Sequence, residues 1–274
     1  MVEQQRPGSI LCPSCRRLIS ANSSVCIHCG HKTRSRWNIK QRLGLPNRLP
    51  LDATTVISSV CIVLYVLALL IDLRAVLQVR GLFDLLSPSG EALFGLGMTG
   101  AGIARLPGGW WTIFTAIYLH GSLLHILFNV LWIRQLGPLV EELYGVARLV
   151  VIFTVSGVLG FVFSNLWGIQ ATVGASGSIF GLLAAVIYYG KRRGGVWGQD
   201  LVRRVGSWVL MFFIFGFLIP GVNNLAHAGG FIGGYLCAFL LGYENKERQA
   251  QLSRLLAGAA VLLTIVAFVR IIVF

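Results

Sequence analysis

The sequence predicts an all-α polytopic membrane protein with seven spanning helices, preceded by a small cysteine-rich head. Of the 274 residues, 55% are hydrophobic and only 12% are charged, whereas a soluble domain is usually about 25% charged. Long apolar runs follow a polar beginning: residues 1–50 hold nine Lys and Arg against a single acidic residue, so +8 of the formal charge of +13 lies there. This composition excludes a soluble globular enzyme.

The head contains four cysteines in a C-x2-C-x10-C-x2-C pattern: Cys12, Cys15, Cys26 and Cys29. Two such pairs can place four thiolates around one zinc ion, and about thirty residues cannot otherwise build a sufficient core. We therefore predict a zinc ribbon over residues 1–32, with one structural Zn²⁺. A disulfide-bonded exported head is the alternative; the basic flank and the lack of a preceding signal peptide disfavour it.

The other metal-ligand residue types receive simpler interpretations. His28 and His31 could each replace a thiolate, but four matched cysteines predict that both histidines face solvent. Cys61 and Cys237 lie alone in apolar runs and are predicted to be small core residues.

A basic linker over residues 33–52 separates the head from a membrane core over 53–245, and residues 246–274 form a cytoplasmic connector and a seventh span. The linker is expected to lie on the anionic membrane surface. Residues 78–119 are too broken by Gly and Pro to span, and we expect an interfacial hairpin there. The expected spans are 53–73, 122–142, 148–167, 176–190, 206–220, 223–242 and 255–274.

The distribution of Lys and Arg predicts the topology, because short cytoplasmic loops retain positive charge. Five basic residues fall in an expected loop over 190–205, and Arg148 falls in the turn between the second and third spans. The opposite connections, 168–175 and 221–223, contain no Lys or Arg. We therefore expect the N-terminus in the cytoplasm and the C-terminus outside, in a plasma membrane of the bacterial inner-membrane type.

Three polar clusters are expected at one depth, near the outer face. They are His120, His125 and Asn129 before and within the second span, Ser176 at the start of the fourth, and Asn223, Asn224 and His227 at the start of the sixth. Polar groups inside a helix bundle are costly and mark a functional site by default.

Ser176 and His227 are the candidate reactive pair, because a histidine can take the proton of a serine hydroxyl. Small residues would let their helices touch, and they lie at Gly177 and Gly181 on one helix and at Gly230 and Gly234 on the other. A serine N-cap and a histidine that only packs are the alternative interpretations.

No acidic residue can complete a triad, since 143–199 and 201–243 contain neither Asp nor Glu. A Ser/His dyad is therefore predicted. His125 and Asn129 share one helical face and, with the Ser176 amide, could stabilise an oxyanion. A polar cluster that ties the loop at 110–120 to the helix is the alternative for this pair, and His120 is expected to serve mainly that purpose.

These residues resemble the rhomboid intramembrane serine proteases over residues 53–245. The matching motifs, in the order of the family, are H-x4-H-x3-N at His120, His125 and Asn129; G-x3-E-x3-G at Gly137, Glu141 and Gly145; G-A-S-G at 174–177, with Gly174 and Gly177 around Ser176; and H-x2-G-x3-G at His227, Gly230 and Gly234.

The resemblance implies a six-helix core, here followed by an added seventh span, with Ser176 as nucleophile and His227 as general base. It implies an oxyanion hole formed by His125, Asn129 and the Ser176 amide. It also implies cleavage of single-pass or polytopic membrane proteins near the outer end of their transmembrane helix, without a catalytic cofactor. The chain departs from the family at Thr112, where Trp-Arg is common, and at Phe180, where many members have tyrosine.

Two other functions are compatible with the pattern. The first is a catalytically silent rhomboid-like protein that binds or sorts membrane clients; the intact Ser176 and His227 disfavour it. The second is a transporter, which the one-sided polar groups and the lack of an inverted repeat disfavour. The head could bind a cytoplasmic protein or dock on the membrane domain, and the scarcity of base-stacking aromatic residues makes a nucleic acid the less favoured partner.

Overall fold

The computed structural model describes residues 9–12, 15, 17–20, 25–30, 52–76, 81–243 and 247–273. The chain divides into two compact units, Met1–Pro50 and Leu51–Phe274. The predicted basic linker lies outside the described residues except at Asp52, where the Asp52 carboxylate caps the first membrane helix by accepting a 2.6 Å hydrogen bond from the Thr55 amide. The predicted domain boundaries remain predictions.

The head contains a two-stranded antiparallel sheet of β1 (Ser9–Leu11) and β2 (Leu18–Ser20), with Ile10 opposite Ile19. The backbone N–H of Cys12 donates to the carbonyl of Arg17 (2.9 Å), which continues the hairpin beyond the strands. The core of the described part is formed by Cys12, Ile19 and Cys26, with Cys15 packed against it. So small a core cannot by itself supply the usual stability of a domain.

The described part of the second unit contains the seven long helices that the sequence predicts, which confirms an all-α polytopic architecture. They are α2 (Ala53–Ile71), α7 (Leu123–Tyr144), α8 (Val146–Leu166), α9 (Ser176–Arg193), α10 (Gly195–Leu218), α11 (Asn224–Leu241) and α12 (Glu247–Val273). Six of these are long and apolar enough to cross a membrane; α9 is not counted among them and ends in three basic residues.

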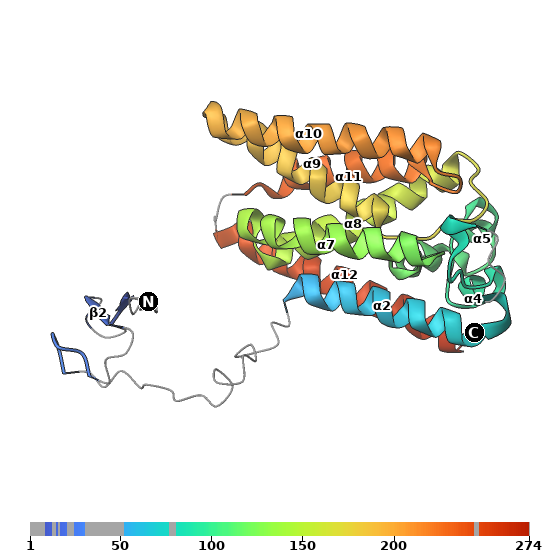
Figure 1. Cartoon of the computed structure of the whole chain (residues 1–274), viewed down its shortest axis with the longest axis horizontal. Helices are drawn as coiled ribbons and strands as arrows, with labels where there is room; N and C mark the ends of the chain where they lie inside the picture. Colours follow the sequence, from blue (N-terminus) through green and yellow to red (C-terminus); the bar gives the residue numbers. More distant parts are fainter. Residues whose placement is uncertain are drawn as a thin grey trace, which may run out of the picture. The chain divides into compact units, whose positions relative to one another are not determined.

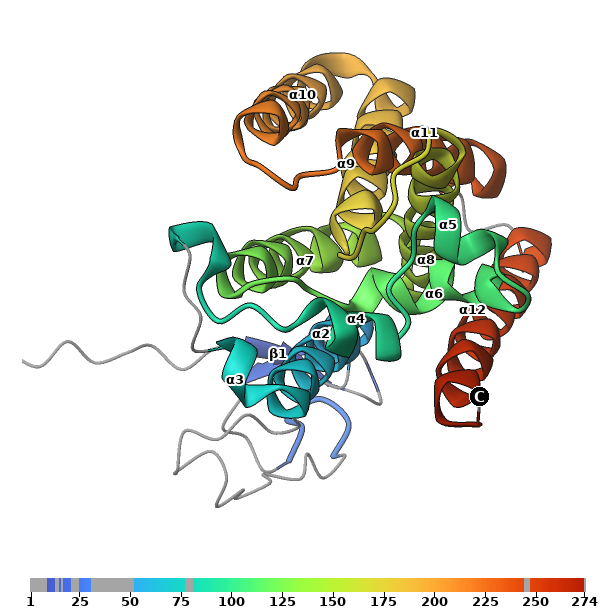
Figure 2. The ribbon, with the colours of Figure 1, turned by 90° about the vertical axis from the view of Figure 1, so that its right-hand side faces the viewer.

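Helix α9 is the most enclosed of the long helices, and it contacts α7, α8, α10 and α11 (Figures 1 and 2). Helix α8 packs on α11 and α12, and α2 packs on α7. Helix α10 lies at the edge of the bundle beside α9 (Figure 2), and only Gly198, Val205 and Gly216 are buried along its length. The added helix α12 contacts α8 and the short helix α6 (Thr112–Thr115).

The described residues between α2 and α7 form seven short helical segments, and in Figure 1 the segment around α4 and α5 lies at one end of the bundle. No helix in the described part of this connection is long enough to span a membrane, as predicted; the interfacial position remains a prediction. Besides α6, the segments are α3 (Leu73–Val76), η1 (Leu82–Asp84), α4 (Gly90–Gly95), α5 (Ala101–Arg105), η2 (Gly109–Trp111) and η3 (Ala116–Tyr118).

The expected loop over 190–205 is wrong, because its basic residues lie within helices, three in the last turn of α9 and two in the first half of α10. Helix α9 continues to Arg193 and α10 begins at Gly195, so Gly194 alone connects them. The positive φ angles of Gly194 and Gly195 (65° and 66°) permit this abrupt reversal. Gly190 and Gly198 then meet with no side chain between the two backbones.

Arg148 also departs from its expected place in a turn. Gly145, with a φ of 83°, ends α7 and directly precedes α8, so Arg148 lies in the first turn of α8. Its side chain is buried and donates to the carbonyl of Tyr144 (3.1 Å). The hydroxyl of Tyr144 in turn donates to the carbonyl of Ala185 (2.8 Å), which joins α7 to α9.

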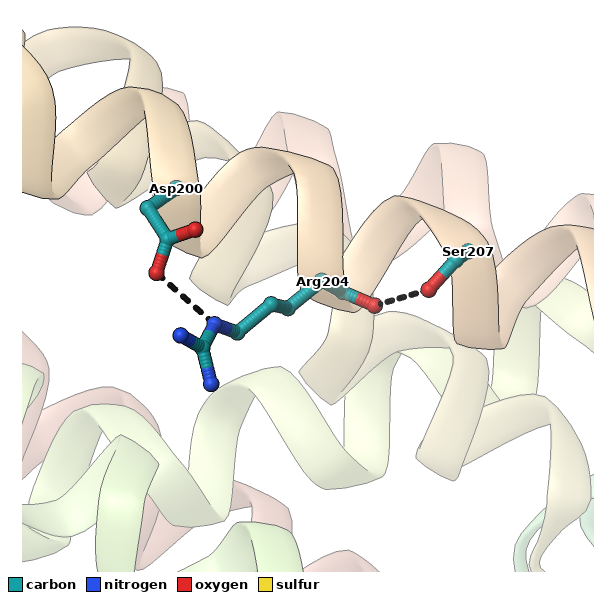
Figure 3. A network of polar contacts seen from close by, with 3 residues as sticks. All are labelled: Asp200, Arg204 and Ser207. Atoms are coloured by element: carbon teal, nitrogen blue, oxygen red, sulfur yellow. Dashed lines mark hydrogen bonds and ion pairs between the residues drawn. The ribbon is translucent and has the colours of Figure 1, made fainter.

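The start of α10 carries an exposed ion pair between Arg204 Nε and Asp200 Oδ2 (2.7 Å), and the Ser207 hydroxyl donates to the Arg204 carbonyl (2.7 Å), as Figure 3 shows. Exposed pairs at this spacing contribute less than about 1 kcal/mol. This network therefore does not hold α10 in place; its contacts with α9 and α11 do.

Helices α9 and α11 touch backbone to backbone through the glycines that the sequence singles out. A methyl group at Gly230 would overlap the backbone of Gly177, and one at Gly234 would overlap the backbone of Gly181. Because glycine has no side chain, the two helices approach more closely than any other residue would allow. The glycines of the predicted small-residue stripe thus lie at the contact between these helices.

Gly234→Ala is expected to lower the midpoint of thermal unfolding in detergent, followed by circular dichroism at 222 nm. The added methyl group meets backbone atoms that cannot rotate away, and overpacking of this kind costs about 1–3 kcal/mol. Gly258→Ala on α12 is the matched control, since open space surrounds that position and the midpoint should not fall. Equal midpoints for both variants would contradict the assignment of this contact.

Candidate active site

Ser176 is the first residue of α9, and the backbone before it makes a turn that only glycine adopts readily. Gly174 has a φ of 126°, and its amide donates to the carbonyl of Ala116 (2.9 Å). A side chain at Gly174 would meet the imidazole of His125, so the glycine also allows that ring to approach. Ser176 is thus presented at a helix start, where backbone N–H groups have no partner within the helix.

His227 lies in the first turn of α11 and faces Ser176. Its Nε2 atom is 2.9 Å from the hydroxyl oxygen of Ser176, and its side chain is buried. The structure therefore brings together the two residues that the sequence places 51 positions apart. Ser176 directly precedes Gly177 of the close contact between α9 and α11, and His227 lies three residues before Gly230 of the same contact.

Phe180, one turn after Ser176, stacks on the imidazole of His227. The ring centroids are 4.3 Å apart and the planes differ by 13°. Phe212 and Phe213 of α10 meet the same phenyl ring edge-on. The phenyl ring therefore restricts the rotation of the histidine without offering a hydroxyl group.

Asn224 makes a contact with His227 to which sequence reasoning assigned no role. Its Oδ1 atom is 3.1 Å from His227 Nδ1, and its amide nitrogen donates to the carbonyl of Phe213 on α10 (3.2 Å). In the sequence, only the spacing indicates this contact: Asn224 lies three residues before His227, on the same face of a helix. The neighbouring Asn223 caps α11 by accepting from the Ala226 amide (3.0 Å).

The structure places His125 beside the serine turn and Asn129 one helical turn further along α7. The amide of Gly121 donates to His125 Nδ1 (3.3 Å), so the imidazole proton is on Nε2, the atom next to Gly174. Asn129 is buried and donates one amide hydrogen to the carbonyl of His125 (2.7 Å). Its second amide hydrogen is not used by that bond.

His120 is fully buried and lies against the loop that precedes α7. Its Nδ1 atom is 3.2 Å from the carbonyl of Tyr118, and its ring meets that of His125 edge-on at 5.1 Å. Burial and the neighbouring His125 lower the pKa of His120 well below its ordinary value. These contacts agree with the expectation that His120 ties this loop to α7.

Thr112, where the family commonly has arginine, anchors the connecting segment through a buried hydroxyl network. Its hydroxyl donates to the carbonyl of Gly109 (2.7 Å) and lies 3.0 Å from the hydroxyl of Thr99. The side-chain amide of Asn165 on α8 donates to Thr99 (3.2 Å). The segment is therefore fixed to α8 without a guanidinium group.

The four cysteines of the head form a second polar cluster, in the other unit. Their sulfur atoms all lie within 4.8 Å of one another, and the Cys12–Cys29 and Cys15–Cys26 separations are both 3.7 Å. Sulfur atoms 2.3 Å from a tetrahedral zinc ion lie about 3.8 Å apart, so the cluster fits such an ion. These separations are too long for disulfides.

The remaining histidines are expected to face solvent and the remaining cysteines to lie in the core, and those that the structure describes do so. His28 is exposed, and its amide donates to the sulfur of Cys26 (3.4 Å). His31 lies outside the described residues. Cys61 and Cys237 are buried in the core of the membrane unit, as predicted.

Comparison with known proteins identifies a matching family and several relatives. The family model of the Rhomboid domain matches residues 107–244. The chain is 34% identical over 139 residues to Rhomboid protease GluP of Bacillus subtilis (strain 168), covering 49% of this chain and 27% of GluP. It is 31% identical over 159 residues to the protein YdcA of the same organism, covering 56% of this chain and 77% of YdcA.

A third relative is the Rhomboid-type serine protease 2 of Emericella nidulans, 31% identical over 151 residues, which cover 52% of this chain and 29% of that protein. The alignments with GluP and with this protease thus span less than a third of those two proteins. The family model nevertheless covers half of the present chain, and the aligned part covers more than two thirds of YdcA. On these matches, the chain belongs to the rhomboid family.

Proposed function

We propose that this chain is an intramembrane serine endopeptidase that cleaves membrane proteins near the outer end of their transmembrane helices. The observation that carries the proposal is the 2.9 Å approach of His227 Nε2 to the Ser176 hydroxyl, with Phe180 stacked on the ring. A serine that only caps its helix would not require a buried imidazole at this distance. Relatives named rhomboid protease or serine protease support the same activity.

The chemistry is acyl transfer through a Ser/His dyad. Ser176 attacks the scissile carbonyl, His227 takes the hydroxyl proton, and the same histidine returns it to the leaving amine. Water then hydrolyses the ester, with His227 again acting as base. No acidic group takes part, because the chain from 143 to 199 and from 201 to 243 contains none.

Charge that develops on the carbonyl oxygen would be stabilised by three donors. The Nε2–H group of His125 lies beside Gly174, the Ser176 amide is at the start of α9, and Asn129 retains one amide hydrogen. Removing one donor of this kind typically costs about 2.7–4 kcal/mol of barrier.

The substrates are single-pass or polytopic membrane proteins whose helix unwinds at the cut. Intact backbone hydrogen bonds hide the carbonyls of a transmembrane helix, so small and helix-breaking residues near the cut should be favoured. The head lies in the cytoplasm and the C-terminus outside, since the basic last turn of α9 and the basic residues in the first half of α10 retain positive charge on one side. The membrane is then of the plasma or inner type.

The head holds one structural zinc ion through Cys12, Cys15, Cys26 and Cys29. Thiolates are the ligands of closed zinc sites, and metal binding would supply the stability that the small core lacks. A cytoplasmic protein is the partner that we assign to this head.

Wild-type protein should react with a fluorophosphonate probe and cleave a reporter whose transmembrane segment begins with Gly and Ser residues, whereas Ser176→Ala should do neither. Labelling joins the serine oxygen to phosphorus, releases fluoride and passes the hydroxyl proton to the histidine. His227→Ala should label at least about 100-fold more slowly, since it removes the general base. Labelling is read by in-gel fluorescence, and cleavage by immunoblot.

Ser178→Ala is the matched control, because this serine lies two residues along the same helix and outside the dyad. Its labelling should equal that of the wild type. A wild-type chain that neither labels nor cleaves would instead indicate a catalytically silent member that binds clients. Cleavage by Ser176→Ala at the wild-type rate would contradict the assigned nucleophile.

Phe180→Leu should slow labelling about three- to tenfold, whereas Phe180→Tyr should stay within about twofold of the wild type. Aromatic stacking contributes about 0.5–1.5 kcal/mol, and leucine cannot hold the ring plane of His227. The rate of labelling at a fixed probe concentration measures the difference. Equal rates for leucine and tyrosine would show that the stack does not restrain the histidine.

The purified wild type should contain about one zinc ion per chain by elemental mass spectrometry, and Cys26→Ser should lose it on dialysis against a chelator. Replacing one thiolate of a four-thiolate site weakens the metal site and leaves the head without its main source of stability. Cys237→Ala, in the membrane core, is the control and should keep its metal. Metal retention by Cys26→Ser would contradict the four-cysteine site.

A further inference from the structure

The side chain of Asn224 connects His227 to α10. Its oxygen faces His227 Nδ1 (3.1 Å), and its nitrogen donates to the carbonyl of Phe213 (3.2 Å). Capping of α11 does not require this side chain, because Asn223 already accepts from the Ala226 amide. The two contacts of Asn224 therefore need an explanation beyond helix stability.

The contact with Phe213 determines which way the Asn224 amide points. A carbonyl oxygen can only accept a hydrogen bond, so the NH₂ group of Asn224 must face Phe213 and its oxygen must face the imidazole. An oxygen in that place accepts from a protonated Nδ1 atom. The proton of neutral His227 then resides on Nδ1, and Nε2 is left to accept the hydroxyl proton of Ser176.

Helix α10 packs on α9 and α11 and meets Trp132 of α7, and Asn224 lies at its contact with α11. Three of its residues are buried, and one of them, Gly216, leaves the space that the Asn224 side chain occupies. A methyl group at Gly216 would overlap both amide atoms of Asn224. The position of α10 and the orientation of this amide therefore cannot vary independently.

We propose that Asn224 is a positioning residue for His227, and that docking of α10 sets its orientation. With α10 docked, the amide oxygen selects the tautomer of His227 that can act as a base. When α10 moves, the Phe213 carbonyl leaves the Asn224 amide. The amide is then free to turn its NH₂ group toward the ring, which favours the opposite tautomer, with Nε2 protonated. This inference rests on the proposed function and adds to it a link between α10 and the dyad.

The test is the saturation kinetics of fluorophosphonate labelling in the full-length protein, which separates the maximal rate of serine modification from probe binding. Asn224→Ala should lower the maximal rate about tenfold, the factor that corresponds to one net hydrogen bond, with probe affinity changed less than about twofold. Asn224→Asp should stay within about threefold of the wild type, because either carboxylate oxygen accepts from Nδ1 without being oriented by Phe213.

Gly216→Ala tests the link from the side of α10 without changing a residue of the dyad. It should lower the maximal rate about tenfold in the wild-type background and less than about twofold in the Asn224→Ala background, where no side chain remains to be displaced. Gly206→Ala on the same helix is the control, since open space surrounds that position and its rate should equal that of the wild type.

The outcomes are distinguishable. A wild type that is not labelled at Ser176 would overturn the proposed function. If the wild type is labelled and Asn224→Ala reacts at the same maximal rate, only the present inference is overturned. Additive losses for Gly216→Ala and Asn224→Ala would also overturn it, and so would a loss in Asn224→Asp as large as in Asn224→Ala. If Asn224→Ala fails to fold, two other measurements still test the inference. They are the maximal rate of Gly216→Ala relative to Gly206→Ala, and the maximal rate of Asn224→Asp relative to the wild type.

Discussion

The contact between the backbones of α9 and α11 is the constraint on which the candidate site depends. Gly177 and Gly181 meet Gly230 and Gly234 with no side chain between them. Ser176 directly precedes Gly177 on one helix, and His227 lies three residues before Gly230 on the other. The short distance between hydroxyl and imidazole is therefore a result of main-chain packing, which is more rigid than an arrangement that relies on long side chains.

Much of this arrangement could be predicted, because the relevant signals are local or periodic. Apolar runs located the long helices to within a few residues at most ends, and glycines four residues apart indicated which helix faces would meet. The spacing of His125 and Asn129 placed both on one face of α7. The roles in catalysis of these residues, and of Ser176 and His227, remain predictions.

Other features depend on partners that sequence spacing does not reveal. The reversal at Gly194 turned an expected basic loop into two helix ends, since two consecutive glycines with positive φ allow helices to follow each other directly. Arg148 is buried because α8 begins at Val146, two residues before the expected start of this span at 148, so that Arg148 lies inside the helix. The Thr112–Thr99–Asn165 network joins residues 66 positions apart at its widest, so no local pattern could indicate it.

The partner of the His227 imidazole is an uncharged amide, and the absence of a charge there affects how readily α11 inserts into the membrane. Helix α11 has a mean hydropathy of 1.3, the lowest among the six spanning candidates in the described part of the chain. An aspartate adds about 2.5–3.5 kcal/mol to the apparent free energy of insertion at the centre of a spanning helix, and less at the start of the helix, where Asn224 lies. Since α11 already carries His227 and Asn224 and is capped by Asn223, an uncharged partner for the imidazole adds less to the cost of inserting this weakly hydrophobic segment than a carboxylate would.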